Sequence, residues 1–388
     1  MASTNTLTNL IPTLYAAADV VSREQVGFIP AVTRDSRIDR VAINQTVDVP
    51  VVGAITPVSI TPGAYAPDTG AAAPGNVAVT ISNQYQAPIA WSGDEQIAVG
   101  ETGIYDNVVT QRFAQAMRAI TNLVEADLAA LHVTASRAYG TYNAQPFGTA
   151  GDLSDMAQMI KILEDNGAPQ TDLRAVLSSS AIANIRGKQS ALFKVNEAGT
   201  DQMLRRGIIG DIFGVGLGTS AQVKTAVVTG TAASATTNAA GYAVGATAIT
   251  LAGVGTGTLI PGDLITFAGD TNVYVVANTV GAVSGGALVI AEPGLRVAMS
   301  AATKAITVIA ATDRNMVFSK SAIVLATRAP YMPEGGDEAD DVMDIVDPVS
   351  GLSFQVAMYR QYRQVHFEVA LAWGVKMIAP RHSAVLIG

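Results

Sequence analysis

Length, composition and charge narrow the kinds of protein that this chain can be. It has 388 residues, of which 14% are charged and 49% hydrophobic, with a formal net charge of -8 and no cysteine. The length allows two or three domains, the negative charge disfavours a protein that grips nucleic-acid phosphates, and the missing cysteines exclude disulfides, thiol nucleophiles and thiolate metal sites. Soluble domains carry about 25% charged residues, so the low charge favours a high-copy assembly with large areas buried between subunits.

Residues 1–40 are expected to form an N-terminal arm. The start, MASTNTLTNLIPTLY, lacks a basic segment followed by an apolar core, and no run approaches the ~18 consecutive apolar residues of a membrane helix, so we expect neither signal-peptide secretion nor a membrane span. A short helix is predicted before Gly27 and Pro30. The segment that follows interleaves aspartates with three arginines, Arg34, Arg37 and Arg40. This mixed sign favours a solvated or subunit-contacting segment over a nucleic-acid contact.

Residues 41–96 have the pattern of β-structure with a turn-rich middle. Short β-prone runs flank the stretch TPGAYAPDTGAAAPGN, which consists almost entirely of turn formers and contains Tyr65 and Asp68. An isolated hairpin is only marginally stable in water. We therefore predict a long two-stranded excursion whose tip is flexible or is ordered only by a neighbour.

A long amphipathic helix is predicted over residues 105–139, where apolar residues recur every three to five positions. At the helical rise per residue it would span about 50 Å. A second helix is predicted over residues 152–166, with Asp152 as N-cap and Gly167 just past its end, and a buried strand and a third helix follow up to residue 193. Helices that alternate with strands after a β-rich opening indicate an α+β fold.

The composition changes over residues 225–310, where Ala, Gly, Thr and Val dominate and strand-like runs recur between Gly-rich turns. This pattern predicts a small all-β barrel or sandwich inserted into the α+β chain. After it, the alternation in FQVAMYRQYRQVHFEVAL predicts long strands, and Asp347, Pro348 and Gly351 mark a tight hairpin connection.

Residue types that perform chemistry form no recognisable set. The histidines His132, His366 and His382 have no spacing that presents two imidazoles to a metal, and no serine lies in a G-x-S-x-G motif. Seven acidic residues between Glu334 and Asp347 are the best metal candidate. Because they lack the EF-hand order, a solvated or subunit-facing acidic loop is favoured. We expect no enzymatic activity, no cofactor and no bound metal.

Glycines crowd the stretch GIIGDIFGVGLGTS at residues 207–220. A P-loop would need G-x-x-x-x-G-K-[ST], and the dinucleotide pattern G-x-G-x-x-G is missing too. The stretch runs into β-prone sequence, whereas a phosphate loop opens a helix. We therefore interpret Gly214, Gly216 and Gly218 as hinge and close-packing positions where the core passes the chain to the inserted domain.

Stretches spread over nearly the whole chain carry a family resemblance. They are LIPTLYAAADVVSREQVGFIPAVTRDS, QRFAQAMRAITNLVEADLAAL followed by ASRAYGT, KILEDNGAPQTDL, LFKVNEAGTDQMLRRGIIGDIFG, GDLITFAG, VDPVSGLSF and ALAWGVKMIAPRHSAVLIG. In this order they resemble the major capsid (coat) proteins of tailed bacteriophages, and most of all the podophage-type coat branch with an inserted β-rich domain.

The resemblance implies the tailed-phage major capsid fold and a division of the chain. The implied parts are an N-terminal arm (1–40), an extended E-loop (41–96), a peripheral domain (97–172) with a spine helix at 101–139, and an axial domain in two pieces (173–224 and 311–335). An inserted β-barrel or sandwich domain (225–310) and peripheral-domain strands with the C-terminus (336–388) complete the division. The stretch from Ser321 to Arg328 is expected in the axial domain near the capsomer centre.

The resemblance also implies a function. Subunits of this family assemble as hexamers and pentamers into an icosahedral shell that encloses double-stranded DNA without binding it specifically. A scaffolding protein and a portal take part, assembly occurs in the host cell cytoplasm, and the product is a virion capsid without a membrane. Some members of the wider fold crosslink a lysine to an asparagine, but residues 41–96 contain no lysine, so we expect noncovalent assembly.

Candidate subunit contacts are charged or aromatic residues of the arm, the loop tip, the segment before the glycine stretch and the acidic loop: Arg34, Arg37, Arg40, Tyr65, Asp68, Arg205, Arg206, Asp337, Asp340, Asp341 and Asp344. We expect some of these acids to pair with arginines of a neighbouring subunit. Two other functions stay open. The same fold forms encapsulin-like compartments that carry enzymes, and the β-rich module would suit a phage tail or surface-binding protein.

Overall fold

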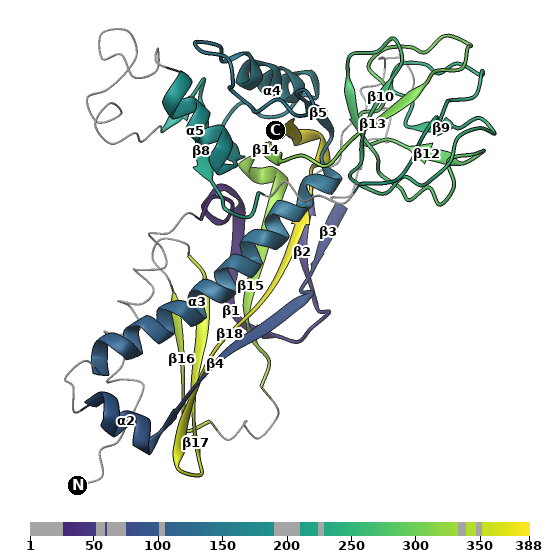
Figure 1. The fold of residues 1–388 in the computed structure, drawn as a ribbon. Helices are drawn as coiled ribbons and strands as arrows, with labels where there is room; N and C mark the ends of the chain where they lie inside the picture. Colours follow the sequence, from purple (N-terminus) through teal and green to yellow (C-terminus); the bar gives the residue numbers. More distant parts are fainter. Residues whose placement is uncertain are drawn as a thin grey trace.

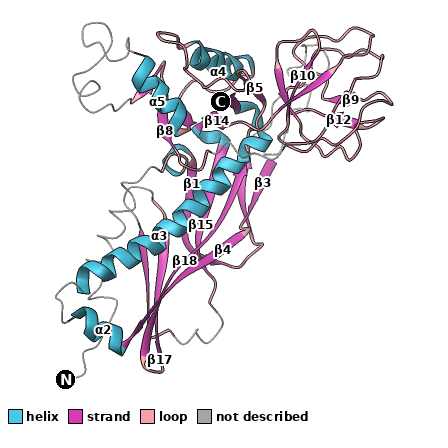
Figure 2. Cartoon of the chain, viewed as in Figure 1, coloured by secondary structure: helices cyan, strands magenta, loops and turns pink. Residues whose placement is uncertain are grey.

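The computed structural model describes residues 26–51, 59, 75–100, 105–189, 210–223, 229–332, 339–346 and 351–388. It shows a mixed α+β fold, an elongated body built on two large sheets (Figure 1, Figure 2). Several sequence predictions fall outside the described residues: the arm helix, the tip of the excursion with Tyr65 and Asp68, and the candidate contacts Arg205, Arg206 and Asp337.

The described helices and 3-10 turns differ widely in length. They are η1 (Ile29–Ala31), α2 (Gly93–Gly100), α3 (Tyr105–Ala130), η2 (Leu131–Thr134), α4 (Ser154–Asp165), α5 (Ser179–Lys188), η4 (Lys320–Ala322) and η5 (Pro380–His382). The 26 residues of α3 span about 39 Å. The prediction of a helix up to residue 139 is therefore wrong at its C-terminal end, because Arg137–Tyr139 form a strand that pairs with two others.

The first sheet has six strands in the order β1-β15-β18-β17-β16, with β4 also paired to β18. The strands are β1 (Thr33–Val41), β4 (Asn83–Ser92), β15 (Ile323–Pro330), β16 (Asp341–Val346), β17 (Ser353–Gln361) and β18 (Gln364–Met377). The prediction of long strands from FQVAMYRQYRQVHFEVAL is confirmed by the β17–β18 pair, which turns at Tyr362 and Arg363.

The helix α3 packs its apolar stripe against one face of this sheet, lengthwise over the strands (Figure 2). Phe113, Met117, Ile120, Val124 and Leu128 form that stripe, and they share a core with residues of β15 and β18. Residues 28–32 join the same core, and residues 33–41 form strand β1, parallel to β15. This end of the predicted arm is thus part of the sheet, with Thr33 and Arg34 exposed.

A hairpin of β2 (Thr46–Val51) and β3 (Gly75–Thr80) packs on the opposite face. It contributes three valines to a small core with β15 and β18: Val47, Val49 and Val79. A Cβ at Gly374 of β18 would lie 2.8 Å from the carbonyl carbon of Thr80, so the glycine permits this close crossing. The base of the predicted excursion therefore packs on the six-stranded sheet of the same chain.

The second sheet has nine strands in the order β13-β10-β11-β5-β19-β14-β6-β8-β7. They are β5 (Arg137–Tyr139), β6 (Leu173–Leu177), β7 (Asp211–Ile212), β8 (Val215–Thr219), β10 (Leu264–Phe267), β11 (Val273–Val275), β13 (Ile306–Ile309), β14 (Arg314–Ser319) and β19 (Ser383–Ile387). The helices α4 and α5 pack on this sheet around a core of their own. The first residue of α4 is Ser154, with Leu153 at the N-cap, and Asp152 accepts the Ser154 N–H at 2.8 Å, so the predicted N-cap is one residue early.

The β-rich segment has its own core between residues 235 and 306, which includes the strand pair β9 (Ala248–Thr250) and β12 (Ala287–Val289). It is nevertheless continuous with the rest of the chain. Its strands β10, β11 and β13 extend the nine-stranded sheet through the pairing of β11 with β5. The segment is an extension of the core sheet as well as a packed unit.

The domain boundaries implied by the resemblance do not coincide with the boundaries between these two sheets. Most of the stretch from Ser321 to Arg328, expected in the axial domain, forms β15 of the six-stranded sheet beneath α3. The C-terminal strand β19, expected with the peripheral strands, lies in the nine-stranded sheet. The reason is geometric: β14 continues into β15 through η4, and β18 into β19 through η5, so both chain segments run from one sheet into the other.

Candidate functional site

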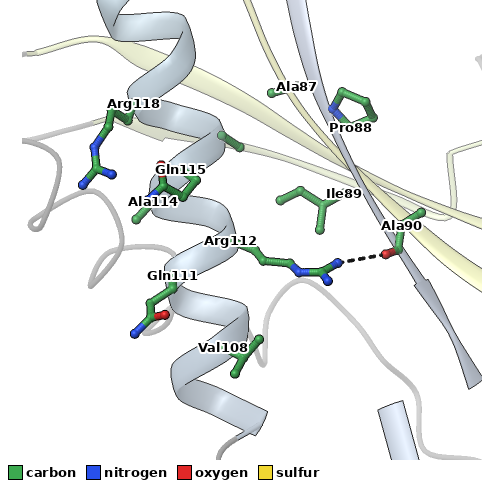
Figure 3. A pocket seen from close by; sticks show the side chains of 11 residues that line it. Ala87, Pro88, Ile89, Ala90, Val108, Gln111, Arg112, Ala114, Gln115 and Arg118 are labelled. Carbon is green, nitrogen blue, oxygen red and sulfur yellow. Dashed lines mark hydrogen bonds between the residues drawn. The ribbon is translucent and has the colours of Figure 1, made fainter. Parts of the chain in front are cut away.

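An open groove of about 570 Å³ lies between α3 and β4 (Figure 3). Small and apolar side chains of both elements line it, together with Gln111, Arg112, Gln115 and Arg118 of the helix. The Arg112 guanidinium donates to the Ala90 carbonyl oxygen at 3.3 Å and lies 4.2 Å from the centre of the Trp91 ring. The groove is thus a cationic surface on an acidic chain, with one arginine held in place by an aromatic ring.

The turn between β17 and β18 is at the far end of the elongated body, near α2 (Figure 1). Tyr362 at this turn is 89% exposed, and the Arg363 guanidinium lies 5.9 Å from the centre of its ring. Aromatic and arginine side chains are enriched in protein interfaces. The turn therefore presents the two residue types that most often anchor a contact.

The acidic residues predicted as subunit contacts lie beside this end of the sheet. Asp340 pairs with Arg360 at 2.9 Å, so this acid has an arginine partner within its own chain. Asp341 and Asp344 lie on β16, and Asp344 is exposed. An ion pair this exposed stabilises a fold by about 0–1 kcal/mol, which leaves Asp340 free to exchange partners at little cost.

The predicted arginines Arg34, Arg37 and Arg40 lie on β1, and the side chains of the latter two are outside the described part of the structure. Arg34 is exposed. The neighbouring Asp35 accepts from the buried Arg328, through its carbonyl oxygen at 2.6 Å and its carboxylate at 3.2 Å. Part of the mixed charge in this segment thus pairs β1 with β15.

Glu125 is a buried carboxylate on α3 that the sequence analysis did not single out. It is 2% exposed, and it accepts the backbone N–H of Phe28 at 2.9 Å, that of Ile29 at 2.8 Å and the hydroxyl of Ser220 at 2.8 Å. Burial raises the pKa of Glu125, and these hydrogen bonds partly oppose the rise. A projection of the helix predicts its burial, because it lies three residues before Leu128, on the edge of the apolar stripe.

The glycine stretch forms a tight hairpin between β7 and β8. Phe213 and Gly214 both have positive φ, 53° and 77°, as a two-residue hairpin turn requires. A Cβ at Gly218 would lie 3.1 Å from the Gly27 carbonyl oxygen. The predicted close packing is confirmed at Gly218, and Ser220 just beyond it is held by Glu125.

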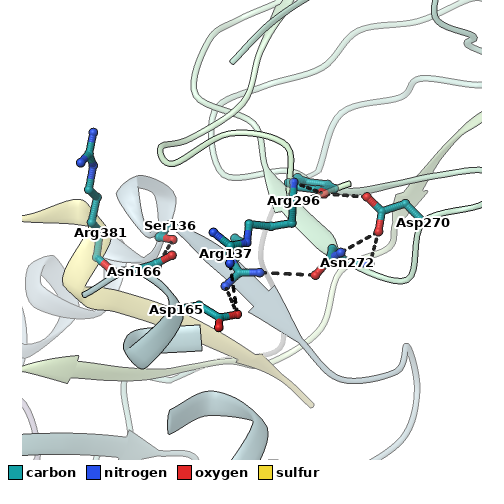
Figure 4. A network of polar contacts seen from close by, with 9 residues as sticks. Ser136, Arg137, Asp165, Asn166, Asp270, Asn272, Arg296 and Arg381 are labelled. Atoms are coloured by element: carbon teal, nitrogen blue, oxygen red, sulfur yellow. Dashed lines mark hydrogen bonds and ion pairs between the residues drawn. The ribbon is translucent and has the colours of Figure 1, made fainter. Parts of the chain in front are cut away.

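A polar network joins the β-rich segment to the core (Figure 4). Arg137 of β5 is 3% exposed, and it donates to Asp165 at the end of α4 and to Asn272 before β11, both at 3.3 Å. Arg296 pairs with the same Asp165 at 3.6 Å. We name Arg137, Asp165 and Arg296 the junction clasp. Burial lowers the pKa of Arg137, and Asp165 acts against that shift.

Two absences concern only the parts of the chain that the structure describes. No group of three or more His, Asp or Glu side chains within those ranges is arranged to hold a metal ion. None of the helices described there combines the length and apolar character needed to cross a lipid bilayer.

No known protein family and no curated protein matches this sequence. Solved structures are similar at low identity: the capsid of cyanophage P-SCSP1u (12% identity over 94% of this chain and 88% of that chain, TM-score 0.46), the virus-like particle from Pyrococcus furiosus (7%, 97% and 98%, 0.44) and a structure from Mycobacterium phage Che8 (13%, 88% and 84%, 0.42). All three TM-scores lie below 0.5.

Proposed function

We propose that the chain is the major capsid protein of a tailed phage, which assembles noncovalently into an icosahedral shell around double-stranded DNA. The observation that supports this most is the elongated body, in which the 26-residue α3 lies along a six-stranded sheet while a hairpin packs on the opposite face. A flat, extended subunit with few charges offers long lateral surfaces to its neighbours. The family resemblance of the sequence is the second line of support for the proposal.

Two described surfaces are assigned to subunit contacts. The first is the groove between α3 and β4, and the second is the β17–β18 turn with Tyr362. The candidates chosen from sequence complete the set, including Arg34, Asp341 and Asp344. Many weak contacts of this kind stabilise a closed shell because each subunit is held by several neighbours at once.

The proposal includes the partners that the family implies. A scaffolding protein and a portal assist assembly in the host cytoplasm, and the finished shell encloses DNA without sequence-specific contacts. The net charge of -8 supports weak contact between shell and DNA, because a DNA-binding face needs an excess of basic residues. The role is structural and not enzymatic.

Expression of the chain alone, followed by sedimentation and negative-stain microscopy, tests the proposal. Shells, rings or tubes of regular diameter are expected, and a monomer at high concentration without particles would contradict it. The nucleic acid protected from nuclease in particles from infected cells then separates a phage capsid from a compartment that carries enzymes.

A further inference from the structure

The chain enters and leaves the β-rich segment through a small group of residues that we name the neck: Gly230, Asp263, Thr312 and Arg314. The Asp263 carboxylate accepts the N–H of Gly230 at 2.9 Å and that of Ile260 at 2.8 Å, which ties the entry to the turn before β10. Arg314 begins β14 and lies opposite Ile387 of β19. The neck is thus where the segment meets the central strands of the nine-stranded sheet.

Arg314 is buried, with 3% of its surface exposed. Its Nη1 donates to the Thr312 hydroxyl, while Nε and Nη2 have no hydrogen-bond partner among the described residues. These two nitrogens form one edge of the guanidinium, and their N–H bonds point the same way. This edge is the fork that pairs with two oxygens of a carboxylate or phosphate.

The surroundings of Arg314 keep the guanidinium charged without pairing it. Burial lowers the pKa of Arg314 to about 10, so it stays a cation at neutral pH. Asp263 attracts it through space, but the Asp263 oxygens accept the two backbone N–H groups of the neck. A buried cation without an acceptor for two of its donors is costly in free energy.

His132 places a second polar atom in the same neighbourhood. Its Nδ1 donates to the Ala129 carbonyl oxygen at 3.0 Å, and its buried Nε2 has no partner among the described residues. Arg314 and burial together lower the pKa of His132, burial being the larger cause. Two buried polar groups that act on each other and lack partners indicate a place for a polar ligand.

We propose that the Nε and Nη2 edge of Arg314 binds a small oxyanion at the neck, a phosphate or a carboxylate. Because Nδ1 of His132 holds the proton, its Nε2 is an acceptor and can take a hydrogen bond from a protonated phosphate oxygen. The anion neutralises the buried guanidinium and fixes the neck against β14. Binding stabilises the connection between the β-rich segment and the core sheet. This site does not depend on the proposed shell function.

Phosphate binding to the purified full-length chain tests the site by calorimetry and thermal unfolding. At a phosphate concentration 100 times the dissociation constant, the ratio of folded to unfolded chain should rise about 100-fold. Chloride at the same ionic strength should not produce this rise. Arg314→Lys keeps the charge but loses the fork, so we expect at least a tenfold weaker phosphate affinity. Arg186→Lys, at an exposed position of α5, is the matched control and should bind phosphate as the wild type does.

Two sources of the oxyanion are distinguished by the state of the protein. If the natural ligand is a free ion, phosphate should bind assembled and unassembled chains alike. If it is a carboxylate of another copy, phosphate should bind only unassembled chains, and added phosphate should weaken the association measured by sedimentation. Either result supports the site. Equal responses of wild type and Arg314→Lys, or no phosphate binding by the wild type, overturn it. If Arg314→Lys does not fold, the calorimetric titration of wild type against His132→Gln replaces it, with weaker binding expected in the variant.

Discussion

At the residue scale, Glu125 links three segments that are far apart in the chain. Its carboxylate joins α3 to Phe28 and Ile29, 97 and 96 residues away, and to Ser220, 95 residues away. The described residues provide it with backbone and hydroxyl donors and not with an ion pair. A buried carboxylate held in this way stabilises the segments only as long as those donors stay in place.

The substitution Glu125→Gln should change how stability depends on pH. Burial raises the pKa of Glu125 in the folded chain above its ordinary value of 4.5. The folded chain therefore binds more protons at this site than the unfolded one, so the stabilisation is fully present below pH 4.5 and is lost as the pH rises through the folded pKa. Glutamine does not titrate. Chemical unfolding across this range should show that the free energy of unfolding of the variant increases relative to that of the wild type as the pH rises. Parallel pH profiles of the two proteins would contradict the burial argument.

A second substitution at the same position separates charge from hydrogen bonding. Glutamine keeps one acceptor oxygen for the N–H groups of Phe28 and Ile29, and its amide can donate to the Ser220 hydroxyl. Leucine leaves these buried N–H groups unpaired, at about 1–3 kcal/mol each. Glu125→Leu should thus lower the free energy of unfolding well below that of Glu125→Gln at every pH, and equal losses would show that the contacts to residues 28 and 29 do not matter.

Two glycine positions should respond differently to the same added methyl group. A Cβ at Gly374 would meet the backbone of Thr80 at 2.8 Å, which is rigid because β3 crosses there. A Cβ at Gly216 would meet the guanidinium end of Arg174, 3.3 Å from Cζ, and that side chain can move. We expect Gly374→Ala to lower the free energy of unfolding by about 1–3 kcal/mol and Gly216→Ala by no more than about 0.5 kcal/mol. Urea unfolding of both variants measures the difference, and the reverse order would contradict it.

At the element scale, the periodicity of the sequence predicted the elements that are determined by residues close to one another in the chain. The apolar stripe of α3 and the long β17–β18 pair follow from periodicities that a helix or a strand imposes on its own sequence. The end of α3 does not, because Arg137–Tyr139 become a strand only through pairing with β11 and β19, more than 100 residues away. Strand β1 was missed for the same reason, since its partner β15 lies near residue 325.

The candidate site was predictable only where its partners are close in sequence. The acidic residues near Asp340 stand out by composition, and one finds its arginine at Arg360, across a hairpin. Glu125 and Arg137 carry no such signal, because their hydrogen-bond partners lie in segments that are distant in the sequence. The family resemblance supplied the order of parts, but it did not supply which strand belongs to which sheet.

The junction clasp should be worth more than the surface ion pair beside it. Asp165 is the shared partner of Arg137, whose side chain is 4% exposed, and of Arg296. Asp165→Ala leaves the buried Arg137 guanidinium without its carboxylate acceptor and should lower the free energy of unfolding by about 1–3 kcal/mol. Glu292→Ala breaks the pair with Arg381, whose side chains are 61% and 55% exposed, and should cost about 0–1 kcal/mol.

A double substitution checks the cause of the Asp165 effect. Arg137→Met removes the buried charge that Asp165→Ala leaves unpaired. The double variant should therefore be more stable than the sum of the two single losses indicates. Strict additivity, measured by urea unfolding, would mean that the clasp does not act as a charge pair.

At the scale of the whole molecule, the two sheets are joined by short 3-10 turns between consecutive strands. Strand β14 of the nine-stranded sheet continues through η4 into β15 of the six-stranded sheet, and β18 of the six-stranded sheet continues through η5 into β19 of the nine-stranded one. Helix α3 leads through η2 into β5 of the nine-stranded sheet. These connections join the two sheets into one elongated body, with the β-rich segment at one end and the β17–β18 turn at the other (Figure 1). The β17–β18 turn is therefore tied to the rest of the body through paired strands and short turns.

This arrangement predicts that the turn matters to assembly and not to folding. Tyr362 is 89% exposed, so Tyr362→Ser should change the free energy of unfolding of the unassembled subunit by less than about 0.5 kcal/mol. In the proposed shell we expect the same side chain to be a contact in every copy, so the loss of about 1–2 kcal/mol per contact should lower the yield of closed particles at least tenfold. Tyr142→Ser is the matched control, since Tyr142 is also exposed, at 54%, but lies beyond α3 near β5. Particle counts by microscopy at equal protein concentration measure this difference. Equal particle yields from Tyr362→Ser and Tyr142→Ser would show that the turn is not an assembly surface. A loss of particles confined to Tyr362→Ser would assign the β17–β18 end of the body to contacts between subunits.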